Sequence, residues 1–303
     1  MDVIILKRIS RMLLRLPVFG NILVNVIQIK SVSGLLQRRS RKSVLRNVEF
    51  QLVDHCNLNC KYCNHFSPIA DEIFADFGVF ERDVSRMSEL FGDSVLHIAL
   101  AGGEPLLHKD VCLFMECTRK YFPSASISLI TNGILLKTVP ESFWNALTEN
   151  NVLLEVTQYP IHINWDYISA TAEKYGCKVQ YSVPRKDGMQ RLPIDPKGSQ
   201  DRVKNYYCQC YMGGFCVSIQ NGRLYPCPIA QNIQYLIKKF ELNIDVGESN
   251  YLDIYQIKSR DEIFDFLSKP VPCCGYCKWD VISYHNAWSR TDGCDVSEWV
   301  DDD

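Results

Sequence analysis

Three cysteines with the spacing C-x3-C-x2-C lie within eight residues, at Cys56, Cys60 and Cys63. Thiolates are soft ligands that bind zinc or iron–sulfur clusters, and the polar loop around them would pack poorly as ordinary core. A structural zinc ion takes four ligands, and His65 could be the fourth, but C-x3-C-x2-C-x-H is not a usual zinc spacing. On a four-iron cluster, three thiolates leave one iron open for a substrate or cofactor.

The segments around this loop alternate between strand and helix patterns. Strands are expected at 48–53, 95–101, 126–133, 151–158 and 178–183. Helices are expected at 80–91, 109–122, 140–149 and 164–176. This order predicts a parallel sheet covered by helices, with ligands beyond the carboxyl ends of the strands. The cysteine loop and the sequences GGEP (102–105), TNG (131–133) and TQYP (157–160) all fall at those ends.

The motif CNLNCKYC resembles the signature of the radical S-adenosylmethionine (SAM) superfamily, including an aromatic residue, Tyr62, before the last cysteine. The resemblance implies that the three cysteines hold a [4Fe–4S] cluster whose open iron is filled by SAM. It also implies that an electron, from a donor such as flavodoxin or ferredoxin, splits SAM into methionine and a 5′-deoxyadenosyl radical. That radical abstracts hydrogen from a substrate, while the protein positions the reactants.

The resemblance extends to residues that would bind SAM. GGEP matches the motif that lines the methionine end, where glycines let the backbone approach closely and Glu104 can accept a hydrogen bond from an ammonium. Asn132 would face SAM, although TNG is a common turn; Thr157 would reach the ribose, and Tyr62 would pack near the adenine or simply within its loop. The expected cofactor-binding residues are Tyr62, Gly102, Gly103, Glu104, Pro105, Asn132 and Thr157.

Eight further cysteines lie in the last 96 residues, and their order resembles the twitch extension, the short form of the SPASM extension of radical SAM enzymes. The resemblance implies one auxiliary [4Fe–4S] cluster. Its expected ligands are Cys210, Cys227, Cys274 and Cys277, with Cys208 and Cys273 as alternates. A zinc site built from the same four cysteines is the alternative. Cys216 or Cys294 is either core or a hydrogen-atom donor to a substrate radical.

The predicted fold class is α/β, a partial (β/α)6 radical SAM barrel with a small C-terminal subdomain of a β-hairpin and helices. Residues 184–206 are rich in turn formers and predict a linker. Beyond it, Asn221-Gly222 predicts the turn of a hairpin, followed by helices at 232–241 and 259–268. The expected organisation is an N-terminal extension (1–47), a radical SAM core (48–205) and an auxiliary cluster subdomain (206–303).

The N-terminal extension differs in charge from the rest of the chain. Residues 1–47 contain ten basic side chains and one acid, although the whole chain has a formal net charge of −2 that gives no indication of nucleic-acid binding. Residues 3–16 have helical periodicity, which predicts either a helix packed on the protein or a basic amphipathic helix at an anionic membrane surface. The uncharged run from 16 to 29 is too short to span a bilayer and lacks a cleavage site. We therefore expect a reducing, cytoplasmic location, with membrane contact through residues 1–30 as a variant.

Three functional hypotheses remain open from the sequence. The spacing of the cysteines from 210 to 277 is most similar to that of 2-deoxy-scyllo-inosamine dehydrogenase-like enzymes. This resemblance implies oxidation or epimerisation of a sugar, a cyclitol or a nucleotide- or lipid-linked sugar. A peptide-maturing radical SAM enzyme is the alternative, weakened because only 47 residues precede the first predicted strand. A non-catalytic iron–sulfur or zinc module has no use for an amino-acid-binding GGEP turn.

Overall fold

The computed structural model describes residues 44–301 except for 183, 200 and 204–209. The chain divides into two units, Met1–Lys42 and Ser43–Asp303, and the second contains all of the described residues. The predicted N-terminal helix, the membrane contact of residues 1–30 and Cys208 lie outside the described residues. Within the described ranges, no helix has the length and apolar composition needed to cross a bilayer.

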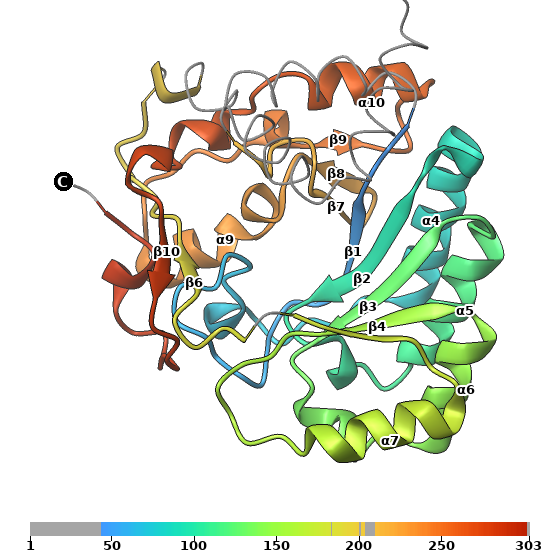
Figure 1. Cartoon of the computed structure of the whole chain (residues 1–303). Helices are drawn as coiled ribbons and strands as arrows, with labels where there is room; N and C mark the ends of the chain where they lie inside the picture. The colour runs from blue at the N-terminus through green and yellow to red at the C-terminus, as the bar shows by residue number, and fades with distance from the viewer. Residues whose placement is uncertain (1–43, 183, 200, 204–209, 302–303) are drawn as a thin grey trace, which may run out of the picture. The chain divides into compact units, whose positions relative to one another are not determined.

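An eight-stranded sheet organises the described unit, in the order β5-β4-β3-β2-β1-β7-β8-β9 (Figure 1). Six of these strands run parallel to one another. They are β1 (Val48–Val53), β2 (His97–Gly102), β3 (Ser126–Thr131), β4 (Val152–Val156), β5 (Val179–Tyr181) and β7 (Val217–Gln220). The predicted α/β class with a partial (β/α)6 barrel is therefore confirmed.

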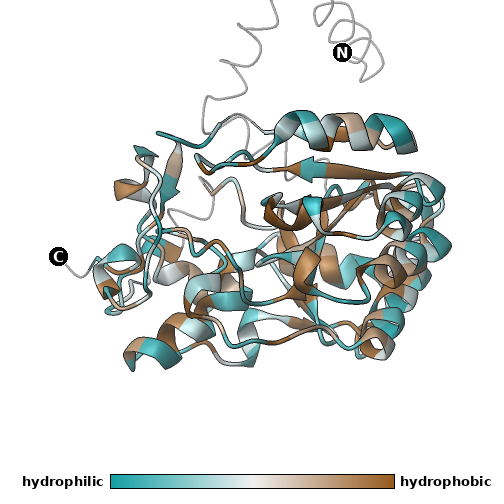
Figure 2. Ribbon diagram, turned by 90° about the horizontal axis from the view of Figure 1, so that it is seen from below, coloured by the Kyte–Doolittle hydropathy of each residue, from teal (hydrophilic) through white to brown (hydrophobic). Residues whose placement is uncertain are grey.

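Four helices cover one face of the parallel strands (Figure 1). They are α4 (Phe77–Phe91), α5 (Val111–Tyr121), α6 (Glu141–Glu149) and α7 (Trp165–Tyr175). Side chains cap two of their N-termini: the Asp76 carboxylate accepts from the amide of Val79 at 2.8 Å, and Asn164 caps α7 in the same way. Their inner faces form the main core, where Phe114 meets Phe80 with ring centroids 4.6 Å apart. Figure 2 shows that the residues of the central strands are mostly apolar, which is typical of parallel strands that are buried on both faces.

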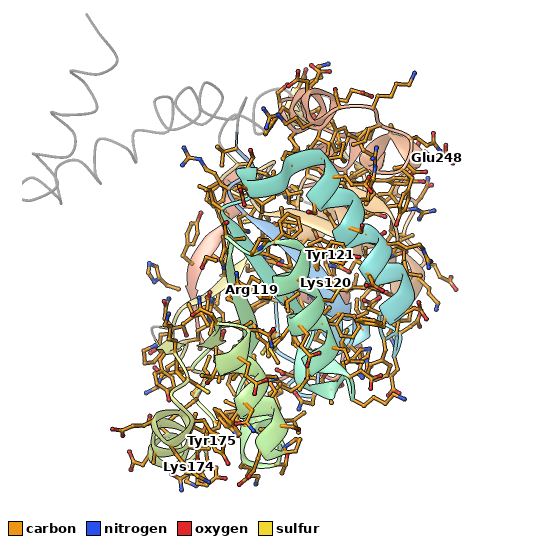
Figure 3. The ribbon with its side chains drawn as sticks, turned by 90° about the vertical axis from the view of Figure 1, so that its right-hand side faces the viewer. Arg119, Lys120, Tyr121, Lys174, Tyr175 and Glu248 are labelled. Carbon is orange, nitrogen blue, oxygen red and sulfur yellow. The ribbon has the colours of Figure 1, made fainter. Side chains whose placement is uncertain are left out.

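Arg119 ties together the loops at the amino ends of the central strands, opposite the cysteine motif. Its guanidinium donates to five backbone carbonyls, those of Phe122, Pro123, Ala125, Asn150 and Asn151. In Figure 3, the neighbouring side chains Lys120 and Tyr121 lie beside it on the helical side of the molecule. These bonds connect the end of α5 to the backbone of the loops that lead into β3 and β4.

The predicted hairpin forms, but it extends the core sheet. Asn221 and Gly222 have φ values of 52° and 76°, as a type I′ turn requires, and they join β7 to β8 (Arg223–Tyr225). Because β7 pairs with β1 in parallel, this hairpin supplies the sixth parallel strand. The antiparallel β9 (Leu252–Asp253) completes the edge. The residues after 206 are therefore joined to the core by shared backbone hydrogen bonds.

Two helices follow the hairpin near their expected places. Helix α9 (Pro228–Phe240) begins four residues before the expected 232, because Cys227 acts as its N-cap and Pro228 starts its first turn. Helix α10 (Arg260–Leu267) begins with a capping box formed by Ser259 and Glu262.

Residues 184–206, expected to be a linker, contain a strand instead. β6 (Met189–Arg191) pairs antiparallel with β10 (Ser283–Asn286) in a second, two-stranded sheet. Figure 1 shows this pair side by side on the opposite side of the sheet from α4–α7. The turn formers of this segment concealed a three-residue strand whose partner lies almost one hundred residues further along the chain.

Candidate active site

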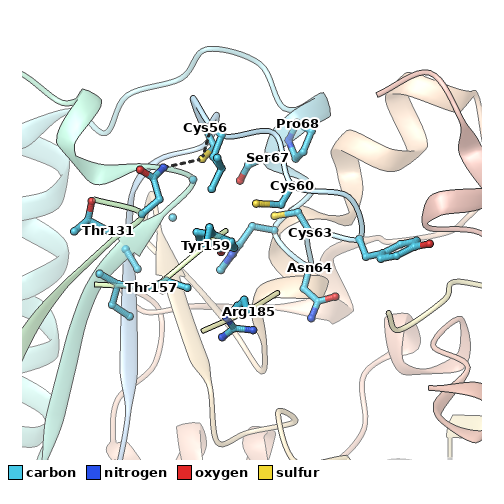
Figure 4. Close-up of a pocket in the computed structure, with 18 of the residues that line it drawn as sticks. Cys56, Cys60, Cys63, Asn64, Ser67, Pro68, Thr131, Thr157, Tyr159 and Arg185 are labelled. Carbon is cyan, nitrogen blue, oxygen red and sulfur yellow. Dashed lines mark hydrogen bonds between the residues drawn. The ribbon is translucent and has the colours of Figure 1, made fainter. Parts of the chain in front are cut away.

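The predicted cysteine motif opens onto a cavity of about 290 Å³ at the carboxyl ends of the parallel strands. Figure 4 shows Cys56, Cys60 and Cys63 on one side of this space, with Thr157 and Arg185 on the other. Of the expected SAM-binding residues, five line the cavity: Tyr62, Gly102, Gly103, Asn132 and Thr157. Segments from four strand ends thus meet at the edge of the sheet where the sequence predicted ligands to bind.

Asn132 connects the TNG turn to the cysteine loop. Its amide nitrogen donates to Asn57 Oδ1 at 2.8 Å and to Cys56 Sγ at 3.6 Å, and its oxygen accepts from the amide of Ile134. Asn132 is 5% exposed, so these bonds replace those it would make to water. Its side chain orients a thiol that the sequence predicts to bind a metal.

Gly102 and Gly103 permit a close approach of two backbone segments. A Cβ on Gly103 would lie 2.0 Å from the carbonyl oxygen of His55, and one on Gly102 would lie 2.3 Å from that of Val53. The Gly103 amide donates to the Val53 carbonyl at 2.7 Å, in the stretch that leads into Cys56. The glycines therefore bring the end of β2 against the start of the cysteine loop.

Glu104 and Pro105 are not among the residues that line the cavity. The Glu104 carboxylate is fully buried and accepts hydrogen bonds from the Thr131 hydroxyl at 2.7 Å and the Asn132 amide at 2.8 Å. Burial raises the pKa of Glu104 to about 7, although these donors act in the opposite direction. Its bonds hold the TNG turn, whereas the sequence predicted a contact with the SAM ammonium.

The three thiols differ in their electrostatic surroundings. Burial raises the pKa of Cys56 to about 12 and that of Cys60 to about 11. Burial also acts against the thiolate of Cys63, but a hydrogen bond and the charge of His65 outweigh it and lower the pKa of that thiol. The His65 ring in turn lies 3.0 Å from a Glu49 carboxylate oxygen. His65 thus pairs with Glu49 and Cys63, a role that differs from the fourth-ligand role considered from spacing alone.

Several cavity residues were missed by sequence reasoning. Tyr159 belongs to TQYP and follows β4, so its place at a strand end was an available signal. Arg185, Met189 and Gln190 come from the segment expected to be a linker, and no local pattern distinguished them. Arg185 is exposed at this edge of the cavity.

The C-terminal cysteines gather around a second, apolar cavity. Its lining includes Cys210, Cys227, Cys273, Cys274 and Cys277, so the four expected ligands and one alternate come together. Burial raises the pKa of all five thiols. Binding a metal cluster here would release their protons.

The two candidate hydrogen-atom donors lie outside both sets of lining residues. Cys294 is exposed in a turn beside Asp292. Cys216 is half-buried, and burial together with the nearby Glu49 raises its pKa to about 11. Glu49 lines the first cavity, so the charge that acts on Cys216 belongs to the wall of that cavity.

The three cysteines of the motif can be tested for their fit to the [4Fe–4S] cluster that the motif implies. Among the described residues, no three His, Cys, Asp or Glu side chains are arranged to hold a single metal ion. A four-iron cluster makes a different demand, because each cysteine binds its own iron. Three thiols on one side of a 290 Å³ cavity fit a cluster that leaves its fourth iron facing the open space.

Comparisons with known proteins agree with this geometry. A sequence model of the Radical SAM superfamily matches residues 50–163. The GTP 3′,8-cyclase of Staphylococcus carnosus is 23% identical over 235 residues, covering 74% of this chain and 62% of the cyclase. That of Thermodesulfovibrio yellowstonii is 30% identical over 115 residues, 36% of each chain. This chain thus spans less than two thirds of the length of either cyclase.

The fold also has a counterpart among solved structures. The crystal structure of BtrN in complex with AdoMet and 2-DOIA has a TM-score of 0.51 and 21% sequence identity, covering 78% of this chain and 94% of BtrN. The parallel sheet and the cysteine loop agree with the match of residues 50–163 to the Radical SAM superfamily, whose proteins use a [4Fe–4S] cluster and SAM. The particular relatives of this chain include GTP 3′,8-cyclases, and it shares its fold with BtrN.

Proposed function

We propose that this protein is a radical SAM enzyme that acts on a small polar substrate with a hydroxylated ring: a sugar, a cyclitol or a nucleotide- or lipid-linked sugar. The observation that carries the proposal is the convergence of Cys56, Cys60 and Cys63 with Asn132 and Thr157 on one cavity. When bound, the cluster and SAM supply an electron and a 5′-deoxyadenosyl radical that abstracts hydrogen. The chain's own residues hold the cluster, orient SAM and shield the reactants from water.

The lining of the cavity supports a polar substrate. Asn64, Arg185 and Gln190 lie on it together with the hydroxyl-bearing Thr157, which offers donors and acceptors to hydroxyl or phosphate groups. The names of two relatives point the same way, since a GTP cyclase acts on a nucleotide and BtrN was crystallised with 2-DOIA. The proposed reaction is an oxidation or an epimerisation, and a peptide substrate is the alternative.

The proposal is tested by SAM cleavage under strictly anaerobic conditions. The reconstituted protein with dithionite should form 5′-deoxyadenosine, and Cys56→Ala should abolish its formation because one of the three cluster ligands is lost. The matched control is Cys112→Ala. Cys112 is a half-buried thiol on α5 and belongs to neither set of predicted cluster ligands, so this variant should still form 5′-deoxyadenosine. Continued 5′-deoxyadenosine formation by Cys56→Ala would place the site elsewhere.

Turnover in deuterated water separates the proposed reactions. A product that gains deuterium at carbon indicates epimerisation with an exchangeable hydrogen donor. Cys216→Ala and Cys294→Ala test the two candidate thiols. A product oxidised by two electrons without deuterium indicates dehydrogenation. Consumption of a peptide, but of no sugar, cyclitol or nucleotide, would contradict the proposed substrate class.

A further inference from the structure

The C-terminal segment after β10 pairs with the cysteine loop itself. The Lys61 amide donates to the Ser289 carbonyl, and the Thr291 amide donates to the Asn59 carbonyl, each at 2.9 Å. These bonds place Cys60 opposite Arg290 in an antiparallel bridge. Residues 289–291 therefore hold the middle of the motif in a fixed register, more than 220 residues away along the chain.

This register brings an indole N–H to a cysteine sulfur. Trp288 Nε1 donates to Cys60 Sγ at 3.1 Å. The Trp288 backbone is fixed by the Lys186 carbonyl at 2.8 Å, and its ring lies against Tyr159 with centroids 6.0 Å apart. An indole N–H can only donate a hydrogen bond, so the Cys60 sulfur is the acceptor in this contact.

We propose that Trp288 raises the reduction potential of the cluster held by Cys56, Cys60 and Cys63, through its N–H to the Cys60 sulfur. This inference depends on the proposed function, since it requires Cys60 to be a cluster ligand. One-electron reduction adds negative charge that the ligand sulfurs share, and a donor at a sulfur stabilises the more negative state. Trp288 is thus a positioning and tuning residue, whose N–H eases delivery of an electron to the cluster.

The chain contains a matched comparison. Trp299 Nε1 donates to the backbone carbonyl of Cys63 at 3.2 Å, so it is bonded to the same loop without touching a sulfur.

The test compares Trp288→Phe with Trp299→Phe in the full-length reconstituted protein. Redox titration monitored by electron paramagnetic resonance gives the potential of the cluster signal that changes when SAM is added. Trp288→Phe should move this potential to a more negative value, because the reduced state loses its donor, and Trp299→Phe should leave it near that of the unchanged protein. Equal potentials in Trp288→Phe and the unchanged protein, or equal shifts in both variants, would overturn the inference.

A second measurement needs no Trp288 variant, so it does not depend on whether Trp288→Phe folds. In protein labelled with ¹⁵N in the indole rings, pulsed electron paramagnetic resonance of the reduced, SAM-responsive cluster should detect a ¹⁵N coupling that persists in Trp299→Phe. If the cluster and its SAM response are present without this coupling, the role of Trp288 fails and the proposed function stands. If no SAM-responsive cluster assembles, the proposed function itself fails.

Discussion

At the scale of single residues, position 103 has no room for any side chain, so only glycine fits there. A side chain there would collide with the backbone of His55, next to Cys56, and backbone cannot move aside as a flexible side chain can. The GGEP motif therefore shapes the cysteine loop before any ligand binds.

We expect Gly103→Ala to destabilise the protein by about 3 kcal/mol and to reduce cluster retention, because the Cys56 segment must move to relieve the contact. Chemical unfolding and iron content after reconstitution measure the two effects. Gly188→Ala is the matched control, since a Cβ there meets no atom within 4 Å. Unchanged stability and iron content in Gly103→Ala would show that the loop tolerates the displacement.

At the scale of elements, a buried polar network joins α9 to β1 and the start of the cysteine loop. Gln51 and Asn232 exchange two side-chain amide hydrogen bonds, both at 2.9 Å. Gln51 also donates to Asp54 Oδ1 at 2.6 Å, and Tyr235 of α9 donates to the other Asp54 oxygen. Because Cys227 is the N-cap of α9, this network connects one predicted cluster ligand to Asp54, two residues before Cys56.

A double-mutant cycle tests this connection. Asn232→Leu should cost about 1–3 kcal/mol of unfolding free energy, because the buried amide of Gln51 loses its partner. Gln51→Leu combined with Asn232→Leu should cost less than the sum of the two single changes, since the pair then leaves fewer polar groups unsatisfied. Strict additivity in urea unfolding would contradict a direct interaction between β1 and α9.

At the scale of the whole molecule, the two sets of cysteines predict two clusters. The reconstituted protein should hold about eight irons, as two [4Fe–4S] clusters. The combined change of Cys56, Cys60 and Cys63 to Ala should leave about four irons, those of the auxiliary cluster. Cys227→Ala by itself should instead remove the auxiliary cluster and leave about four irons on the first. Iron and zinc analysis with Mössbauer spectroscopy measures this, and four irons with a tightly bound zinc would contradict the auxiliary cluster.

The same measurement distinguishes the alternate ligands. Cys273 and Cys274 are adjacent and both line the second cavity, so their geometry does not choose between them. Cys273 is almost fully buried and its amide donates to Asn250, whereas Cys274 was the ligand expected from the spacing to Cys277. Cys274→Ala should therefore lose the auxiliary iron, while Cys273→Ala should retain it.

The sequence by itself was sufficient to predict the class, the parallel strands with their helices, and the cysteines that face the first cavity. These signals are local: helical and strand periodicity, a turn-forming Asn-Gly pair and a motif within eight residues all survive in the linear chain.

Only the tertiary structure decided how distant segments complete the site. Arg185 and Gln190 line the cavity from an expected linker, β7 becomes the sixth parallel strand beside β1, and Trp288 reaches the Cys60 sulfur from near the C-terminus. Strand pairing and side-chain hydrogen bonds between segments far apart leave no periodic trace in either segment, because their partners are chosen when the chain folds. Short motifs in the sequence therefore predict the cluster ligands, whereas long-range contacts in the folded chain supply the residues around them.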